Sequence, residues 1–511
     1  MATALRKTDT ADAQRRFLLG GALMMGIAAF LGVVGGLLSS DLTASLPFVY
    51  LLPWIFGLLA LLATPTLILH YRGRLTLYDP LVFATWSYFF PAFVIGGLML
   101  TAGWSDPYYL TFIQDAEFNL PYTIALIMLG FAGLAAGYFT PFGVRAGAAV
   151  SRIIPRRDFD SSVMLMPGLF LLILGTFNTI GALIIGVIGY QRSDAIESYD
   201  GIVFLTTLFW MQGSFILWYV IFKRGTFDVR AVVLVSLLLL ATIGKALISG
   251  NRASLLQVFI IVILAFLLSG RRLNFRRTVF AGIILSVCLI AGMIYGTTFR
   301  HIKGTEAQTS IEQYTENIFE TIDQVGKFDV GNSLQMALLG LAERLDTLSS
   351  VAVVVSNYEQ LAPYEESYGL DNNIWKDLST FFIPRILWDE KPIASEPRKY
   401  SDLYFDYGDN SFAITPIGDL LRNYGPVGVP IGMFLFGIII RFIYRSLIED
   451  QPRTIWRATM YFMLLMAISY EAFYGLLIPF LFKVGLTAAV GLLIVGVVAR
   501  LSGFQRTDTP N

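Results

Sequence analysis

The stretch IGDLLRNYGPVGVPIGMFLFGIIIRFIYRS, residues 417–446, decides the fold class of this chain. From position 426 onward it is almost unbroken apolar sequence, and about 20 such residues are enough to cross the hydrocarbon core of a bilayer as a helix. Asp419 precedes the apolar run, whereas Arg441 and Arg445 lie towards its far end. Because positive charge accumulates on the cytoplasmic side of membrane proteins, the run predicts a span with its arginine end in the cytoplasm.

The same pattern recurs along the whole chain and predicts about twelve transmembrane helices. Their ranges are 17–38, 47–69, 79–101, 120–140, 163–188, 202–222, 231–249, 253–270, 278–298, 426–446, 457–475 and 479–499. Connections on one side carry twenty-three Lys and Arg, whereas the short connections on the other hold only Arg192, Lys245, Arg252 and Lys483. We therefore expect both termini in the cytoplasm.

Composition supports an all-α polytopic membrane protein. The 511 residues are 55% hydrophobic and 14% charged, whereas soluble chains carry about 25% charged residues. The single cysteine, Cys288, excludes an internal disulfide, and two histidines make a histidine-rich metal site improbable. The phosphate loop, zinc-protease and dinucleotide motifs are absent, which argues against a nucleotide-driven machine. We expect no metal and no cofactor.

The spans divide the chain into three regions: nine helices in 1–298, one large extracytoplasmic loop in 299–425, and three helices in 426–511. The loop holds twenty Asp and Glu against ten Lys and Arg, which excludes nucleic acid as a partner. It is also rich in Tyr and Trp, including Trp388 and Tyr424. These rings suit stacking on sugars, and they equally suit an aromatic belt at the membrane interface.

Two segments of this loop carry clustered charge. Residues 334–356 have helical periodicity interrupted by Glu343, Arg344 and Asp346, which predicts a helix at the interface or one dipping towards a water-filled cavity. Residues 380–392 contain two prolines and predict a loop, which is either a site or a surface salt-bridge cluster. The residues that it gathers are Arg385, Trp388, Asp389, Glu390 and Lys391.

A short turn, SGNRAS at 249–254, joins two predicted spans. Arg252 would there lie at a helix N-terminus, where exposed amides already favour anions. Lys245 lies seven residues earlier, near the same face of a continuous helix. The turn predicts an anion pocket, the alternative being cations that merely flank or snorkel from a span.

Several motifs in residues 240–440 resemble the Wzy-type O-antigen and oligosaccharide-repeat-unit polymerases. They are the GNR turn, FRHIKG at 299–304, IPRILWDEKP at 383–392, and IGDLLRNYGPVGVPIGMFLFG at 417–437, and they occur in order on one predicted side of the membrane. One departure is Asp419, where the family pattern has Glu. The first half of the chain matches only as apolar spans.

The resemblance implies a metal-independent glycosyltransferase with a GT-C-like fold at the periplasmic face of the bacterial inner membrane. Its donor and acceptor would be oligosaccharides linked to polyprenyl diphosphate, with membrane lipids as surroundings and a chain-length regulator as a further candidate partner. Cations must neutralise the leaving diphosphate, and a base must take the proton of the sugar hydroxyl. The candidate cations are Arg252, Arg300, Arg344, Arg385, Lys391 and Lys245, and the candidate bases, in order of preference, are Asp419, Asp346, Glu471 and His301.

Three alternatives remain open from sequence. An O-antigen ligase shares this topology but would transfer the glycan to lipid A-core. A non-enzymatic flippase for lipid-linked sugars would carry more charge within its spans. At residue level, Asp419 could instead pair with Arg422 one helical turn away and merely stabilise the entry to its span.

Overall fold

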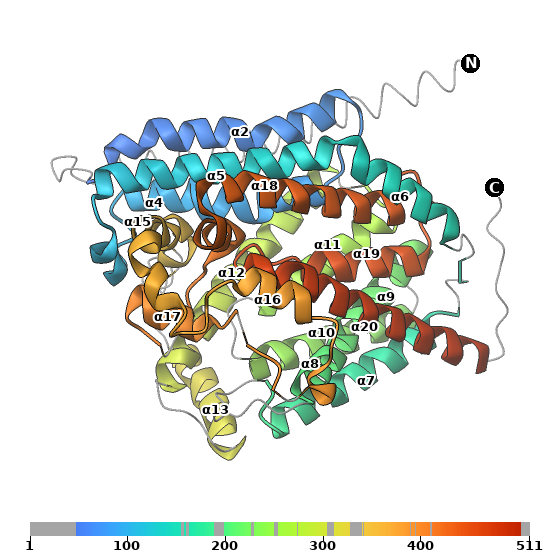
Figure 1. Cartoon of the computed structure of the whole chain (residues 1–511). Coiled ribbons are helices and arrows are strands. Elements are labelled where there is room, and N and C mark those ends of the chain that lie inside the picture. Colours follow the sequence, from blue (N-terminus) through green and yellow to red (C-terminus); the bar gives the residue numbers. More distant parts are fainter. Residues whose placement is uncertain are drawn as a thin grey trace.

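The protein is described by a computed structural model. The residues it describes are 47–154, 158–159, 163–188, 199–225, 229–249, 254–272, 274–303, 311–327, 340, 342–388, 390–393, 395–408 and 411–501. Within these ranges the chain forms helices and no β-strand (Figure 1). The predicted first span, 17–38, lies outside the described residues.

The first part of the chain supplies most of the helical bundle. Its elements are η1 (Val49–Leu51), α2 (Leu52–Tyr71), α3 (Pro80–Ala84), the π-helix η2 (Thr85–Ile95), α4 (Gly96–Thr101), η3 (Tyr108–Phe112), α5 (Ala116–Phe139), α6 (Pro141–Ile153), α7 (Leu165–Ile184), α8 (Asp200–Thr207), α9 (Phe209–Arg224), α10 (Val229–Ser249), α11 (Ser254–Leu268) and α12 (Phe275–Lys303).

The remainder of the described chain adds eight further helical elements. These are α13 (Ile311–Lys327), α15 (Thr347–Glu365), α16 (Asn373–Thr380), η4 (Arg385–Leu387), α17 (Pro397–Phe405), α18 (Thr415–Leu447), α19 (Ile455–Ala467) and α20 (Tyr474–Leu501). Figure 1 shows α15 and α17 at one end of the bundle, which we call the capped end, and α16 further along it, beside α20, against which it packs.

Eight helical segments in the described residues are long and apolar enough to cross a membrane. They match eight of the twelve predicted spans: Val49–Tyr71, Pro80–Thr101, Ala116–Phe139, Leu165–Ile184, Asp200–Arg224, Phe275–Phe299, Thr415–Leu447 and Tyr474–Leu501. Three others are shorter apolar helices, Ala231–Leu247, Leu255–Leu268 and Ile455–Ala467. Within the described residues the all-helical architecture is confirmed, and eight predicted spans coincide with helices that could cross a membrane. The count of twelve full-length spans is not confirmed.

The predicted span 457–475 is wrong in its second half. Helix α19 ends at Ala467 after 13 residues, and the chain runs irregularly through 468–473 before α20 begins. Irregular backbone at this depth is tolerated where protein surrounds it. Tyr470 in this segment is buried and packs against the rings of Tyr88, Phe89 and Phe436.

The predicted boundary between loop and span at 425/426 coincides with a break in α18, where two helical stretches meet. Helix α18 already begins at Thr415, and position 425 is a kink within it, where Gly425 has φ 69° and ψ −171°. Glycine adopts this conformation without steric strain, and Pro426 supplies no N–H to the helix across the kink. The polar residues 415–422 are thus a buried helical segment rather than the end of a loop.

The charges at 343–346 predicted either a helix at the interface or one dipping towards a cavity, and the burial of the first half of α15 argues against a helix lying on a surface. The first nine residues of α15, Thr347–Val355, are all buried, and the helix packs against α5, α17 and α18. The charged residues lie just before α15. The helical periodicity therefore reflects a helix of the protein core, and the charges lie in the segment that leads into it.

Helices α5 and α18 form the most extensive pairing in the fold, and glycines allow it. A Cβ at Gly133 would lie 2.4 Å from the carbonyl oxygen of Pro430, and one at Gly137 would lie 2.0 Å from that of Phe434. Small residues four apart let two helix backbones approach closely, as in many membrane proteins. This contact fixes α18, which carries the polar segment 415–424.

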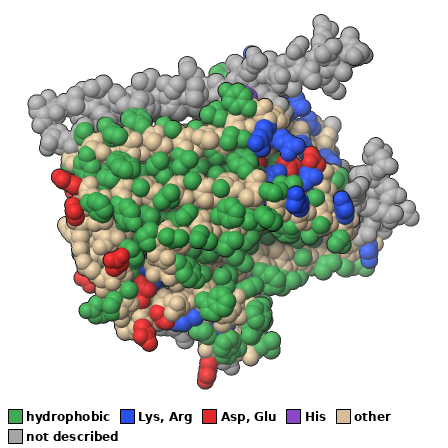
Figure 2. Space-filling model, turned by 45° about the horizontal axis from the view of Figure 1, so that its top comes forward, with side chains coloured by type: hydrophobic (Ala, Val, Ile, Leu, Met, Phe, Trp, Pro, Cys, Tyr) green, Lys and Arg blue, Asp and Glu red, His purple; other side chains and the backbone are tan. Residues whose placement is uncertain are grey.

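Charge is sorted between the two ends of the bundle. Figure 2 shows most of the visible Lys and Arg side chains gathered at one end with a few acidic ones among them, most of the visible acidic side chains towards the other end, and a broad hydrophobic surface between. At the basic end, Arg441 pairs with Glu449 at 2.7 Å and Lys223 with Asp158 at 3.0 Å. Connections predicted to share a side of the membrane therefore do lie together.

Candidate functional site

A buried ionic network lies under the capped end. Arg422, on the first turns of α18, contacts two carboxylates: its Nη2 lies 3.0 Å from Oδ1 of Asp419, and its Nη1 lies 2.7 Å from Oε1 of Glu365 at the end of α15. Tyr404 on α17 also donates to Glu365, at 2.8 Å. Since buried charges are tolerated when paired and hydrogen-bonded, Arg422 ties α15, α17 and α18 together.

Asn373, the first residue of α16, extends this network. Its Nδ2 donates to Oδ1 of Asp419 at 3.0 Å and to Oγ of Ser395 at 2.8 Å, and its Oδ1 accepts from Arg422 at 2.8 Å. The backbone N–H of Gly475 donates to Oδ2 of Asp419 at 3.2 Å. Asp419 therefore also holds the N-terminus of α20, where a carboxylate is favoured by the exposed amides and the helix dipole.

Asp419, the preferred base from sequence, is completely buried. Its two oxygens already accept from Asn373, Arg422 and Gly475. This is the pairing with Arg422 that the sequence left open as the alternative. A carboxylate with both oxygens engaged and no exposed surface is poorly placed to take a proton from a substrate.

Asp377 lies one turn further along α16 and is half-buried. It accepts a short hydrogen bond from the hydroxyl of Ser395. Burial raises the pKa of Asp377 to about 6, against the effect of this hydrogen bond, and the nearby charge of Asp419 adds to the increase. A carboxyl with a pKa near neutrality, reachable from solvent, suits general acid–base chemistry.

Three cations converge on the same place. The charges of Lys483 on α20 and Lys391 on the loop after η4 both act on Asp377 and lower its pKa. Burial and the charges of Lys483 and Arg385 lower the pKa of Lys391. Lys391 also donates to the carbonyl of Ile383 at 2.9 Å, which holds the loop in place. We call Arg385, Lys391 and Lys483 the cation cluster.

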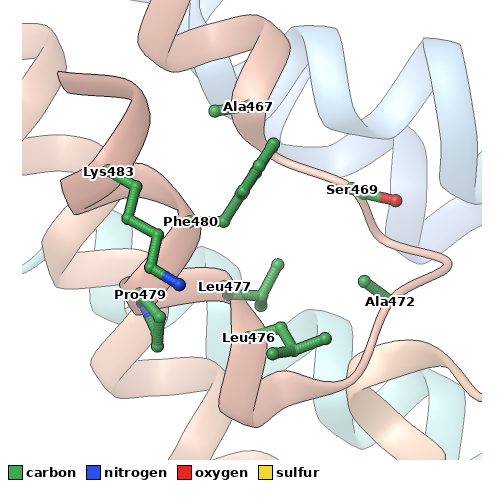
Figure 3. Close-up of a pocket in the computed structure, with 8 residues that line it drawn as sticks. All are labelled: Ala467, Ser469, Ala472, Leu476, Leu477, Pro479, Phe480 and Lys483. Atoms are coloured by element: carbon green, nitrogen blue, oxygen red, sulfur yellow. The ribbon is translucent and has the colours of Figure 1, made fainter. Parts of the chain in front are cut away.

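A pocket of about 250 Å³ opens beside Lys483 (Figure 3). Figure 3 shows Lys483 and Phe480 on one wall, both from α20, and Ser469 and Ala472 from the irregular segment on the other. The remaining lining residues are apolar: Ala467, Leu476, Leu477 and Pro479. A cation at the rim of an apolar pocket suits a ligand with a hydrophobic part and an anionic part.

Two predicted bases have partners of their own. Asp346 is buried and caps α15, accepting from the backbone N–H of Ser349 at 3.0 Å and the hydroxyl of Ser105 at 2.8 Å. Burial raises the pKa of Asp346 to about 6. Glu471 lies in the irregular segment and pairs with Arg344 at 2.9 Å, with both side chains largely exposed.

The other predicted site residues lie away from the cation cluster or outside the described residues. Lys245 packs over the ring of Trp210 on α9, 3.9 Å from its centre. His301 is exposed near the end of α12, and Trp388 and Tyr424 are exposed. Arg252 lies outside the described residues, as does the side chain of Arg300. Of the predicted cations, the structure brings Arg385 and Lys391 together.

Sequence reasoning missed Asp377 and assigned Lys483 no role beyond its side of the membrane. Asn373 and Asp377 are four residues apart on a strongly amphipathic helix, so their common face was predictable. Lys483 is a lone cation within an apolar run, which is itself a functional signal. Their meeting depends on how α16 packs against α20.

Residues 178–448 match a family model described as "Domain of unknown function (DUF8712)". This is more than half of the chain. The chain belongs to this family. The matched region includes α15 to α18 and thus Asp377, Arg385 and Lys391, whereas Lys483 lies beyond it. No curated protein and no solved structure matches the chain significantly.

Proposed function

We propose that this protein is a membrane glycosyltransferase that polymerises oligosaccharide repeat units linked to polyprenyl diphosphate. The supporting observation is the position of the half-buried Asp377 beside the cation cluster, one member of which, Lys483, lines an apolar pocket. The resemblance to Wzy-type polymerases supplies the substrate class. In this proposal the capped end faces the periplasm, and the basic end and both termini face the cytoplasm of a bacterium.

The depth of the pocket fits a lipid-linked substrate. Helix α20 has 28 residues, more than the roughly 20 that cross a hydrocarbon core. About 20 residues back from Arg500, the helix reaches the level of Phe480 and Lys483. The pocket and the cation cluster would therefore lie near the boundary where a lipid diphosphate meets its hydrocarbon chain.

Asp377 is the proposed general base. The acceptor hydroxyl attacks the anomeric carbon of the donor glycan, and Asp377 takes the hydroxyl proton as the new C–O bond forms. With a pKa of about 6, the carboxyl is mostly ionised at neutral pH and still basic enough to accept that proton. Asp419 then has a structural role, holding Asn373 and the start of α20.

The cation cluster is the proposed site for the leaving group. The bond between the anomeric carbon and the diphosphate oxygen breaks, and its electron pair leaves with the lipid diphosphate. Arg385, Lys391 and Lys483 would neutralise the charge that develops on that oxygen, as donors do in an oxyanion hole. Arg385 can do so with two parallel hydrogen bonds, whereas the lysines act as point charges.

The test is polymer formation by purified protein in vesicles, from a synthetic polyprenyl-diphosphate repeat unit. We expect Asp377→Asn, and Lys483→Ala in a separate variant, each to slow polymerisation roughly 100-fold. The matched controls are Asp371→Asn and Lys376→Ala, because these two residues form a half-buried ion pair on the same segment, 2.7 Å apart. Both controls should polymerise like the wild type.

Two results would count against this proposal. A normal polymer ladder from Asp377→Asn would remove the proposed base. A wild-type protein that makes product only when lipid A-core is added would favour the ligase alternative over the polymerase.

A further inference from the structure

The loop at residues 381–388 exposes an unusual amount of apolar surface. Phe382, Ile386 and Leu387 are 59%, 52% and 77% exposed, and Trp388 is 37% exposed. Apolar side chains occurring singly on a surface need no explanation, but a contiguous group on one short loop indicates a contact surface.

This surface is continuous with a stripe of exposed apolar residues on α20. The stripe consists of Phe482, Leu486, Val490, Leu493 and Val497, each between 41% and 69% exposed. Their spacing of three or four residues places them on one face of the helix. Since α20 is a candidate membrane span, this face is the one that lipid covers.

The loop joins the stripe at its first member. The rings of Phe381 and Phe482 meet edge to face, with centroids 5.3 Å apart. Phe482 lies about 18 residues from Arg500, near the length that crosses the hydrocarbon core. The loop thus lies at the level where lipid headgroups meet acyl chains.

The polar residues of the loop fit that position. Arg385 is half-buried within the apolar group, and arginine can extend its guanidinium to anionic headgroups while its stem remains among apolar side chains. Trp388 suits the same interface, where its ring is apolar and its N–H can reach water. Lys391 fixes the loop from behind through its bond to Ile383.

We propose that the 381–388 loop is inserted into the headgroup and acyl boundary of the bilayer and serves as a lipid-contact surface of the capped end. This inference does not depend on the proposed reaction, because it follows from exposure and from continuity with α20.

The test is the accessibility of a nitroxide spin label in vesicles of phosphatidylethanolamine and phosphatidylglycerol. The label is placed by Leu387→Cys in a Cys288→Ser background, and two matched controls carry Leu493→Cys on the stripe or Tyr364→Cys. Tyr364 is 59% exposed near the end of α15, outside the spans. All four changes replace exposed or half-exposed side chains, and gel filtration checks folding.

We expect the label at 387 to collide with oxygen several-fold more than with a water-soluble nickel complex, as at 493 and unlike 364. Two outcomes overturn the inference. Nickel accessibility like that at 364 would place the loop in water. Poor access for both reagents would mean that another protein, or a second copy of the chain, covers it.

Discussion

Replacing Asp377 by asparagine should stabilise the protein while it removes the proposed base. Asparagine keeps the shape of the side chain and can still accept the hydrogen bond from Ser395. The folded-state pKa of Asp377 is raised from 3.8 to about 6. The unfolded chain therefore ionises first as pH rises, and the wild type loses stability between pH about 4 and about 6 relative to a neutral residue.

The size of the effect follows from the pKa. A shift of about two units corresponds to about 3 kcal/mol at most, and screening by solvent at a half-buried side chain reduces this to about 1–2 kcal/mol. The gain of Asp377→Asn should be absent near pH 4, grow up to pH about 6 and stay constant above it. In a chain of this size it corresponds to a rise of about 1–2 °C in apparent Tm.

The assay is thermal unfolding in detergent across this pH range, followed by fluorescence-detected gel filtration without substrate. Asp371→Asn is a control whose expected change in stability has the opposite sign, because the hydrogen bond from Lys376 lowers the pKa of Asp371. Asp371 thus stabilises the folded state above its unfolded pKa, and the asparagine variant should be equally or less stable there. A gain for Asp377→Asn that does not depend on pH, or a loss at neutral pH, would refute the reasoning.

Three further predictions concern the same region. Lys483→Ala removes a cation that lowers the pKa of Asp377, so the acid limb of the pH–rate profile of its residual activity should move to higher pH. If the acid limb does not move, the charge of Lys483 does not act on the base. Arg422→Gln leaves two buried carboxylates unpaired and should destabilise the fold by about 3–5 kcal/mol, whereas Arg344→Gln breaks an exposed pair and should change stability by about 1 kcal/mol or less. Similar Tm values for both variants would contradict the structural role of the network. Gly475→Ala would place a Cβ 3.0 Å from both Oδ2 of Asp377 and the Cα of Ile374. The variant should therefore lower both the polymerisation rate and Tm. Normal values of both would show that α16 and α20 pack more loosely.

The candidate site shows where sequence reasoning reaches its limit. Asp419 and Arg422 are three residues apart, so their pairing was accessible from helical spacing alone. Arg385 and Lys391 are close in sequence and share one loop, so their proximity was predictable too. The link between Asp377 and Lys483 joins positions more than a hundred residues apart. No local pattern specifies such a contact.

The sequence by itself predicted a helical membrane fold. In a bilayer few structures can hydrogen-bond every backbone N–H and C=O group, and the length of each apolar run indicates whether it can form a span. The sequence also determined which connections lie together, since Lys and Arg are sorted by side. The tertiary structure alone decided the break at 468–473, the early start of α18 at Thr415 and the burial of Asp419. These features arise where polar groups from α15, α16, α18 and α20 satisfy one another, and such a network depends on packing in three dimensions rather than on the spacing of residues along any one helix.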